Sequence, residues 1–173
     1  MTSHQLVNQT SGAIEYFTPV ELINAARLCM GGIELDPASC SEANLVVGAD
    51  RFFTKEDDGL KQSWAAETVW LNWPFGKNEN PVWSKMIVSE YTKGNFKHAC
   101  CICYACTSEK WFRPLMQFPQ CFLHGRTNYR LPDGTVKKGN TKGSVVTYFG
   151  PTPGMFAHAF NSFGTIKIVY PLP

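Results

Sequence analysis

The sequence predicts an α/β fold with a mainly parallel sheet and helices on both faces. Short apolar runs typical of buried strands alternate along the chain with segments of helical periodicity. The 173 residues are 44% hydrophobic, which is enough for one well-packed core. We find no internal repeat, low-complexity block or linker. We therefore expect a flexible arm over residues 1–14 and a single domain over 15–173.

The first expected helix spans residues 18–30. Thr18 is a good N-cap, Pro19 suits the first helical position, and Glu21 completes a capping box with Thr18. A glycine pair at 31–32 ends the helix.

The next expected strand, over residues 33–35, runs into Asp36. A turn of small residues follows, and a capping box from Ser39 to Glu42 begins a helix that reaches about Val47. This arrangement places a carboxylate and open backbone N–H groups at the sheet edge where open α/β folds bind ligands. Asp36 is therefore a candidate partner for the ammonium group of an amino-acid moiety.

The rest of the chain continues the alternation. Residues 50–60 lack a periodic pattern, and we expect an irregular loop there. The later expected elements are strands over 68–71, 99–105, 121–123, 144–149 and 165–169 and helices over 80–94, 108–116 and 155–163. Because the segment between Asp36 and Asn72 is short, the sheet is expected to be abbreviated.

The most informative segment is the turn that follows the strand over 68–71. It contains Asn72, Trp73, Pro74 and Phe75 in succession. The Asn72 side-chain oxygen can accept a hydrogen bond from an exocyclic amino group. Trp73 is held extended by the following proline and can offer its carbonyl as a second acceptor. With the flat ring of Phe75 nearby, these acceptors suit the amino group of a base turned out of a duplex.

A basic hairpin is predicted over about 125–143, with its turn at residues 132–134. The net charge of the whole chain is only +2, so the overall field does not indicate nucleic acid. The local distribution does, because phosphates attract clustered cations. The cations of this segment are Arg126, Arg130, Lys137, Lys138 and Lys142. A solvated hairpin without a partner is the alternative interpretation.

The seven cysteines allow two interpretations. Cys103 and Cys106 have the spacing of a redox or zinc motif, but no second pair with matching spacing follows. The segment over 99–105 is better explained as a buried strand in which cysteine acts as a small apolar residue. We therefore expect no metal, while a redox or metal module stays open as an alternative class. Unpaired thiols and the lack of a signal peptide or membrane-spanning pattern favour the cytoplasm and no membrane association.

Taken in order, these motifs resemble the phage-type DNA N6-adenine methyltransferase family, often called phage Dam-like. The family pattern is aromatic-Thr-Pro, an Asp-Pro-Ala-like turn, aromatic-aromatic-Thr, Asp-Gly-Leu with a later Trp, Asn-Pro-Pro-Tyr, Thr-x-x-x-Trp-Phe and Gly-Arg. Its counterparts here are residues 17–19, 36–39, 52–54, 58–60 with Trp64, 72–75, 107–112 and 125–126. The resemblance runs from about 15 to about 149. Its main departure is Trp73, where the family has proline.

The resemblance implies a Rossmann-like class I methyltransferase fold that uses S-adenosyl-L-methionine to methylate N6 of adenine in double-stranded DNA. It implies a catalytic turn of Asn72, Trp73, Pro74 and Phe75. The implied cofactor-binding residues are Tyr16, Phe17, Thr18, Pro19, Asp36, Pro37, Ala38, Ser39, Asp58 and Asn72, with Asp50 or Asp57 as substitutes for Asp58. The implied DNA-binding residues are Trp111 and Arg126, which the cations Arg130, Lys137, Lys138 and Lys142 extend.

Two alternatives stay open within this scaffold. The same turn serves the N4 amino group of cytosine, so an N4-cytosine DNA methyltransferase is one alternative. The other is a catalytically impaired DNA- or cofactor-binding protein, because Trp73 replaces the family proline and its indole can plug the base pocket. We expect a phage- or prophage-encoded protein acting in a bacterial cytoplasm as a monomer or weak dimer.

Overall fold

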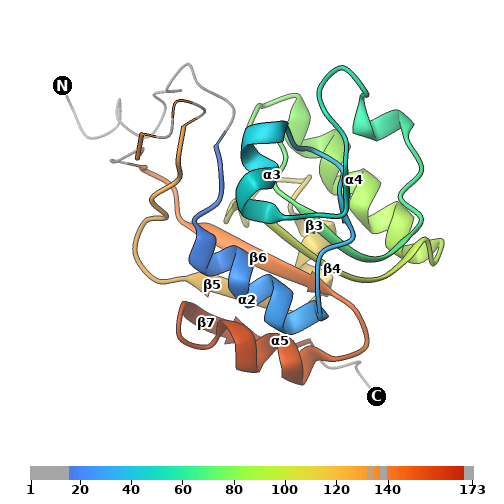
Figure 1. The fold of residues 1–173 in the computed structure, drawn as a ribbon. Helices are drawn as coiled ribbons and strands as arrows, with labels where there is room; N and C mark the ends of the chain where they lie inside the picture. Colours follow the sequence, from blue (N-terminus) through green and yellow to red (C-terminus); the bar gives the residue numbers. More distant parts are fainter. Residues whose placement is uncertain (1–15, 132, 134, 137–139, 170–173) are drawn as a thin grey trace.

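The structure is a computed structural model that describes residues 16–131, 133, 135–136 and 140–169. Figure 1 shows a central sheet with helices packed against it. The helices are α2 (Val20–Met30), α3 (Ser41–Val47), α4 (Glu79–Thr92) and α5 (Pro153–Phe160), with 3-10 turns η1 (Gly59–Lys61) and η2 (Arg113–Gln117). The strands are β1 (Leu35–Asp36), β2 (Arg51–Phe52), β3 (Ala66–Leu71), β4 (Phe96–Tyr104), β5 (Gln120–Leu123), β6 (Ser144–Phe149) and β7 (Gly164–Lys167).

Seven strands form one sheet in the order β2-β1-β3-β4-β6-β5-β7. Strands β2, β1, β3 and β4 run parallel, whereas β6 is antiparallel to both β4 and β5, and β7 is antiparallel to β5. The predicted α/β class with a parallel centre is confirmed. Because β1 and β3 are parallel neighbours, both end at the same edge of the sheet.

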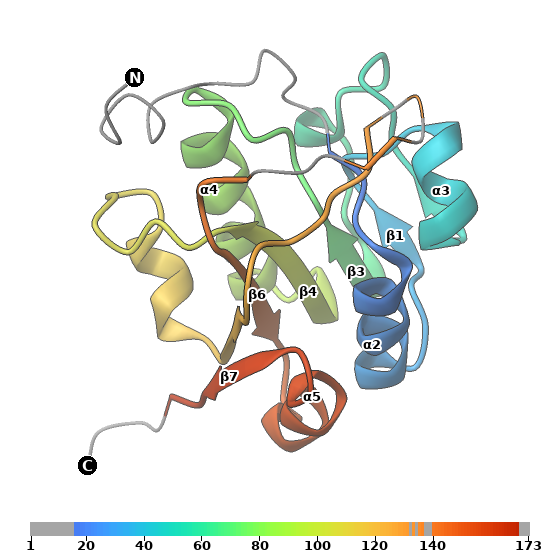
Figure 2. The same cartoon turned by 90° about the vertical axis from the view of Figure 1, so that its left-hand side faces the viewer.

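Helices cover both faces of the sheet, as predicted. Figure 2 shows α2 and α3 on one side of the sheet and α4 on the other. Helices α2 and α5 pack together on the first face, over an apolar layer that includes Trp70 and Ile102. Helix α4 and η2 cover the second face, over a layer that includes Leu71 and Trp73. No helix among the described residues is both long and apolar enough to span a membrane.

The cysteine-rich run is a buried strand, as predicted. In β4, Cys100 belongs to the layer under α2 and α5, and Cys101 and Cys103 belong to the layer under α4. Burial raises the pKa of the Cys101 thiol to about 12, so this cysteine stays neutral and behaves as a small apolar group. No group of three or more His, Cys, Asp or Glu side chains among the described residues is placed to hold a metal ion.

Both predicted helix caps are wrong. Helix α2 begins at Val20 with Pro19 as its N-cap, and no side chain caps it. Helix α3 begins at Ser41, where the Cys40 thiol accepts a hydrogen bond from the Ala43 amide at 3.4 Å. Long-range backbone pairing explains the shift of α3. The Ser39 amide donates to the carbonyl of Phe53 at 2.9 Å and keeps that residue out of the helix.

Two further expectations fail, one because of strand pairing and one because of a proline. The segment expected to be an irregular loop contains β2, which pairs in parallel with β1 through Leu35 and Arg51. The helix expected over 108–116 is only the 3-10 turn η2, preceded by turns. Pro114 lies inside that expected helix, where its ring removes an N–H donor and clashes with the preceding turn.

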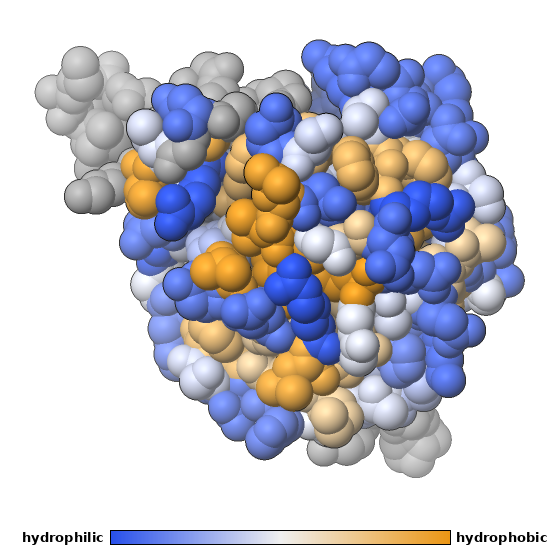
Figure 3. Space-filling view, viewed as in Figure 1, coloured by the Kyte–Doolittle hydropathy of each residue, from blue (hydrophilic) through white to orange (hydrophobic). Residues whose placement is uncertain are grey.

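Surface apolar groups gather on the helical face shown in Figure 1. Figure 3 shows hydrophobic residues in the middle of this face, surrounded by hydrophilic ones. Val20 and Leu28 of α2 and Leu45 of α3 are exposed apolar residues of these helices. Single exposed apolar side chains are normal on protein surfaces, so this face does not by itself indicate a site.

Candidate functional site

A cavity of about 790 Å³ opens where β1 and β3 end. Its walls come from segments far apart in the sequence: residues 16–18, the turn after β1 with α3, the loop over 54–60, and residues 70–74. The predicted cofactor-binding residues on this wall are Tyr16, Phe17, Thr18, Asp36, Pro37, Ala38, Ser39, Asp58 and Asn72. Pro19 instead lines a second cavity of about 430 Å³, beside Arg130. The parallel arrangement of β1 and β3 therefore brings most of the predicted residues together.

The Asn72 carboxamide has a defined orientation. Its Nδ2 donates a hydrogen bond to the main-chain carbonyl of Tyr16 at 2.5 Å. If the carboxamide were flipped, its oxygen would face the Tyr16 carbonyl oxygen, and neither atom could donate. The contact therefore places Nδ2 toward Tyr16 and Oδ1 away from it. Asn72 Oδ1 is buried and has no hydrogen-bond partner among the described residues. The turn therefore holds an acceptor at the cavity wall whose hydrogen-bonding capacity is unused.

Three more buried polar atoms at this wall lack a partner within the described part of the chain. They are the hydroxyl oxygens of Thr18 and Ser39 and the indole nitrogen of Trp70. A buried polar group without a hydrogen bond costs about 1–3 kcal/mol. A ligand that supplies the missing partners would recover this free energy. Trp70 is not among the residues predicted from the sequence, although it lies two residues before Asn72, a spacing that in extended backbone places side chains on one side.

Asp36 is a buried carboxyl group on the same wall. Its side chain is only 2% exposed and accepts a hydrogen bond from the Ala38 amide at 3.1 Å. Burial raises the pKa of Asp36 to about 7, and the hydrogen bond from the Ala38 amide opposes this only in part. Neither ion pair between described residues includes this carboxyl group. The environment of Asp36 therefore favours an incoming cation.

Gly59 sets the position of the loop over 54–60. A Cβ atom at this glycine would lie 1.9 Å from the carbonyl oxygen of Pro37, so only glycine allows this approach. Asp58, which has a left-handed φ of 55°, lines the cavity and pairs with Lys61 at 2.7 Å. Asp50 and Asp57 do not line it. Of the three acids considered from the sequence, only Asp58 reaches the cavity.

Trp73 contributes to the cavity wall, but its indole lies in the core on the other face of the sheet. The side chain is 1% exposed, and Nε1 donates a hydrogen bond to Asn80 Oδ1 at 2.8 Å. Its ring meets the ring of Trp111 edge to face, with centroids 6.4 Å apart. Because the indole is held beneath α4, it does not plug the cavity. The alternative of an impaired protein loses the argument on which it was based.

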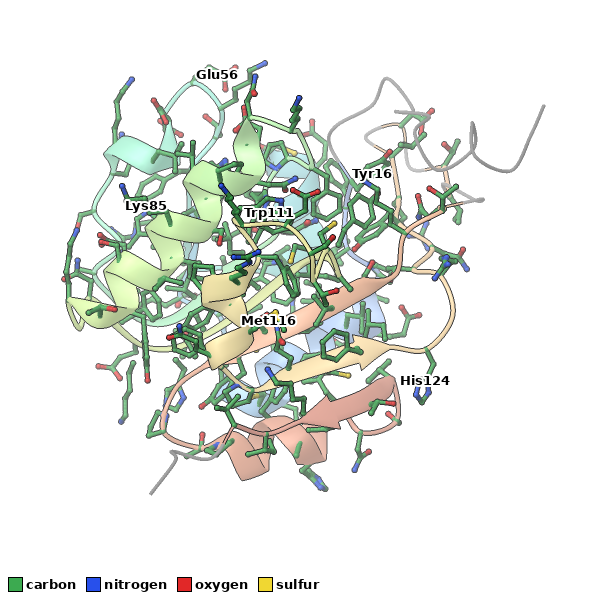
Figure 4. All side chains as sticks on the ribbon, turned by 180° about the vertical axis from the view of Figure 1, so that it is seen from behind. Tyr16, Glu56, Lys85, Trp111, Met116 and His124 are labelled. Carbon is green, nitrogen blue, oxygen red and sulfur yellow. The ribbon has the colours of Figure 1, made fainter. Side chains whose placement is uncertain are left out.

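Phe75 and Trp111 lie away from the cavity. The half-buried Phe75 ring packs among three tyrosines, with centroids 4.6 Å from Tyr104, 5.4 Å from Tyr129 and 5.7 Å from Tyr16. Figure 4 shows Trp111 beside α4, where its carbonyl accepts a hydrogen bond from Ser84. The predicted base-stacking role of Phe75 and the DNA-binding role of Trp111 stay predictions.

The basic segment lies next to residues 16–18. Backbone hydrogen bonds join Phe17 and Arg130 at 2.7 and 2.9 Å, and Arg130 also pairs with Val136, as expected of a hairpin. Arg126, Arg130 and Lys142 are exposed, and the Lys142 ammonium lies 5.6 Å from the centre of the Tyr104 ring. Lys137 and Lys138 lie outside the described residues. Arg130 thus lies beside the segment that contacts Asn72.

The fold and the site together define a class of protein. A Rossmann-like sheet that places a buried acid and an amide-bearing turn at one cavity is the architecture of a methyltransferase. The model of the family DNA N-6-adenine-methyltransferase (Dam) matches residues 10–161, and the chain belongs to this family. It is therefore a DNA adenine-N6 methyltransferase, as the motif order predicted. No curated protein matches the sequence closely enough to count as a relative.

Proposed function

We propose that the cavity binds S-adenosyl-L-methionine and that Asn72 presents the acceptor for the target amino group. The observation that carries this proposal is that several buried polar atoms without a hydrogen-bond partner among the described residues belong to residues of one cavity wall. Thr18, Trp70 and Asn72 each contribute such an atom, and the carboxyl group of Asp36 lies on the same wall. A cavity of about 790 Å³ is also within the range of about 300–1,000 Å³ typical of small-molecule sites.

The wall fits the chemical groups of this cofactor. Asp36 is a suitable partner for the ammonium group, because an adjacent cation favours the ionised carboxylate. The Trp70 indole N–H can only donate, so it suits a carboxylate or a ring nitrogen. The Thr18 hydroxyl can donate or accept. When bound, the cofactor supplies a methyl group on a positively charged sulfur.

In this proposal, Asn72 acts on the target amino group by accepting a hydrogen bond from one of its N–H groups. The lone pair of an amino group on an aromatic ring is delocalised, which makes the nitrogen a weak nucleophile. An acceptor at Asn72 Oδ1, with the Trp73 carbonyl as the second, draws the hydrogens out of the ring plane and localises the lone pair. The same oxygens stabilise positive charge that develops on the nitrogen. The bond from Asn72 to Tyr16 holds the first acceptor in place beforehand.

The product identifies the reaction. Duplex DNA is incubated with protein and cofactor, digested to nucleosides and examined by mass spectrometry. N6-methyldeoxyadenosine is expected in the wild-type sample, and it should fall below detection for Asn72→Ala while cofactor affinity stays within about threefold. N4-methyldeoxycytidine, or no methylated nucleoside, would overturn the assignment. Full activity of Asn72→Ala would overturn only the role of Asn72.

A further inference from the structure

The catalytic turn is tied to α4 by a side-chain contact that the proposed chemistry does not use. Trp73 Nε1 donates to Asn80 Oδ1 at 2.8 Å, and Asn80 is the second residue of α4. The indole is 1% exposed and packs edge to face on Trp111. Trp111 is itself held to α4, because its carbonyl accepts a hydrogen bond from Ser84 at 2.6 Å.

Backbone hydrogen bonds continue this connection beyond the indole. The Gly76 amide donates to the carbonyl of Pro74 at 2.8 Å, and the Asn80 amide donates to the carbonyl of Gly76 at 3.1 Å. The turn that starts at Asn72 therefore runs directly into the first turn of α4. Its beginning is fixed by the Trp73 side chain and its end by the backbone.

This anchor has a geometric consequence for the backbone at Trp73. Pro74 restricts the conformation of the residue before it, mainly through ψ. A proline at position 73 would fix φ as well, at about −65°. Trp73 has no ring to do so, but a buried indole held at its nitrogen fixes the direction of the Cα–Cβ bond. Fixing that direction restricts φ, and φ and ψ together orient the Trp73 carbonyl.

We infer that the Trp73–Asn80 pair is a positioning device that holds the catalytic turn in place of the second proline of the family motif. The inference rests on the role proposed for Asn72. The Trp73 indole and Asn80 act through the turn and not by touching substrate, whereas the Trp73 carbonyl is the group that they orient. Asn80 does not line the cavity, so its loss is expected to affect methyl transfer and leave cofactor binding intact.

Three variants test the device. Asn80→Ala removes the acceptor, Asn80→Asp keeps an acceptor oxygen, and Trp73→Phe removes the donor but keeps an aromatic ring. Single-turnover methylation is measured well below the unfolding temperature, together with the dissociation constant of the cofactor. A displacement of about 1 Å in an active site can cost about 100-fold in rate. We therefore expect Asn80→Ala to be about 10- to 100-fold slower, with cofactor affinity within about twofold.

The conservative and double variants separate positioning from folding. Asn80→Asp is expected to stay within about fivefold of the wild-type rate. The double variant Trp73→Phe with Asn80→Ala is expected to be no slower than the slower single variant, because both remove the same contact. Additive losses would refute the device. A lower melting temperature of Asn80→Ala with an unchanged methylation rate would also refute it. A parallel loss of methylation rate and cofactor affinity in Asn80→Ala would do the same.

Indole nitrogen NMR gives a readout that needs no activity. The chain has five tryptophans, and Trp73→Phe identifies the Nε1–H signal that belongs to position 73. That signal should be protected from hydrogen exchange in the wild type and lose protection in Asn80→Ala. Unchanged protection would refute the contact. Absence of N6-methyladenine with wild-type protein would refute the proposed function instead, so the two failures are distinguishable.

Discussion

Replacing Asp36 with asparagine is expected to stabilise the cofactor-free protein near neutral pH and to weaken cofactor binding. The substitution keeps the size of the side chain and the oxygen that accepts the hydrogen bond from Ala38. It removes only the ionisable group. Burial raises the pKa of this carboxyl group from 3.8 to about 7.

The magnitude follows from linkage between proton binding and folding. A folded-state pKa above the unfolded value means that the folded protein binds the proton more tightly, so stability falls as pH rises from about 4 to about 7. A difference of about 3 pK units, at about 1.4 kcal/mol per unit, corresponds to about 4 kcal/mol. Asp36→Asn should therefore match the wild type near pH 4 and exceed it by up to about 4 kcal/mol above pH 7.

Urea unfolding between pH 4 and 8, without cofactor, measures this difference. Asp50→Asn serves as the control for loss of one negative charge, because Asp50 is exposed and lies away from the cavity. A stability difference between Asp36→Asn and wild type that does not grow with pH would refute the burial argument. So would an Asp36→Asn protein that is less stable than wild type at pH 8.

Cofactor binding should respond in the opposite direction. Since an ammonium group favours the ionised carboxylate, wild-type affinity is expected to rise with pH through 7, with proton release detectable by calorimetry in different buffers. Asp36→Asn should bind about 10- to 100-fold more weakly, because it loses a charge-assisted hydrogen bond. Its affinity should also depend less on pH. Equal affinity of the two proteins at pH 8 would remove Asp36 from the proposed cofactor site.

Three further outcomes are expected. Trp73→Pro, which restores the family residue, should lower the free energy of unfolding in urea by about 3–5 kcal/mol, because it empties the space of a buried indole. A stability equal to that of the wild type would contradict the packing described. Arg126→Ala and Lys142→Ala should each weaken DNA binding and make the DNA affinity less dependent on salt concentration. Lys85→Ala, on the exposed side of α4, should change neither. Equal effects of all three substitutions would argue against a DNA surface at the hairpin. Trp70→Phe keeps an aromatic ring but removes an N–H group that has no partner among the described residues. Calorimetry should therefore show weaker cofactor binding, and unfolding experiments should show a stability equal to or above that of the wild type. Unchanged cofactor affinity would exclude an indole contact with the cofactor.

Much of the architecture could be predicted because its signals are local. Apolar runs marked most of the strands, and β6 begins and ends where the sequence indicated. The motif around Asn72 was recognised from four consecutive residues. The parallel order of β1 and β3 then brought Asp36 to the same cavity, as strands that alternate with helices require.

The errors arose where distant residues decide local structure. Ser39 and Thr18 have the composition of helix caps, but Ser39 is held by a backbone hydrogen bond to Phe53, and the cap of α2 is Pro19. Other features have no local signal at all. The Phe75 ring packs against tyrosines that lie far away in sequence. Trp70 is an ordinary strand residue by pattern, and only the fold shows that its nitrogen has no hydrogen-bond partner among the described residues.

The segment over residues 16–18 has one consequence beyond its place in the cavity wall. Tyr16 accepts the hydrogen bond from Asn72, and its neighbour Phe17 is paired with Arg130 in the basic hairpin. A shift of the hairpin would therefore reach the carboxamide through two adjacent residues. In the proposed arrangement, DNA bound at the hairpin would act on the Asn72 carboxamide through this backbone connection.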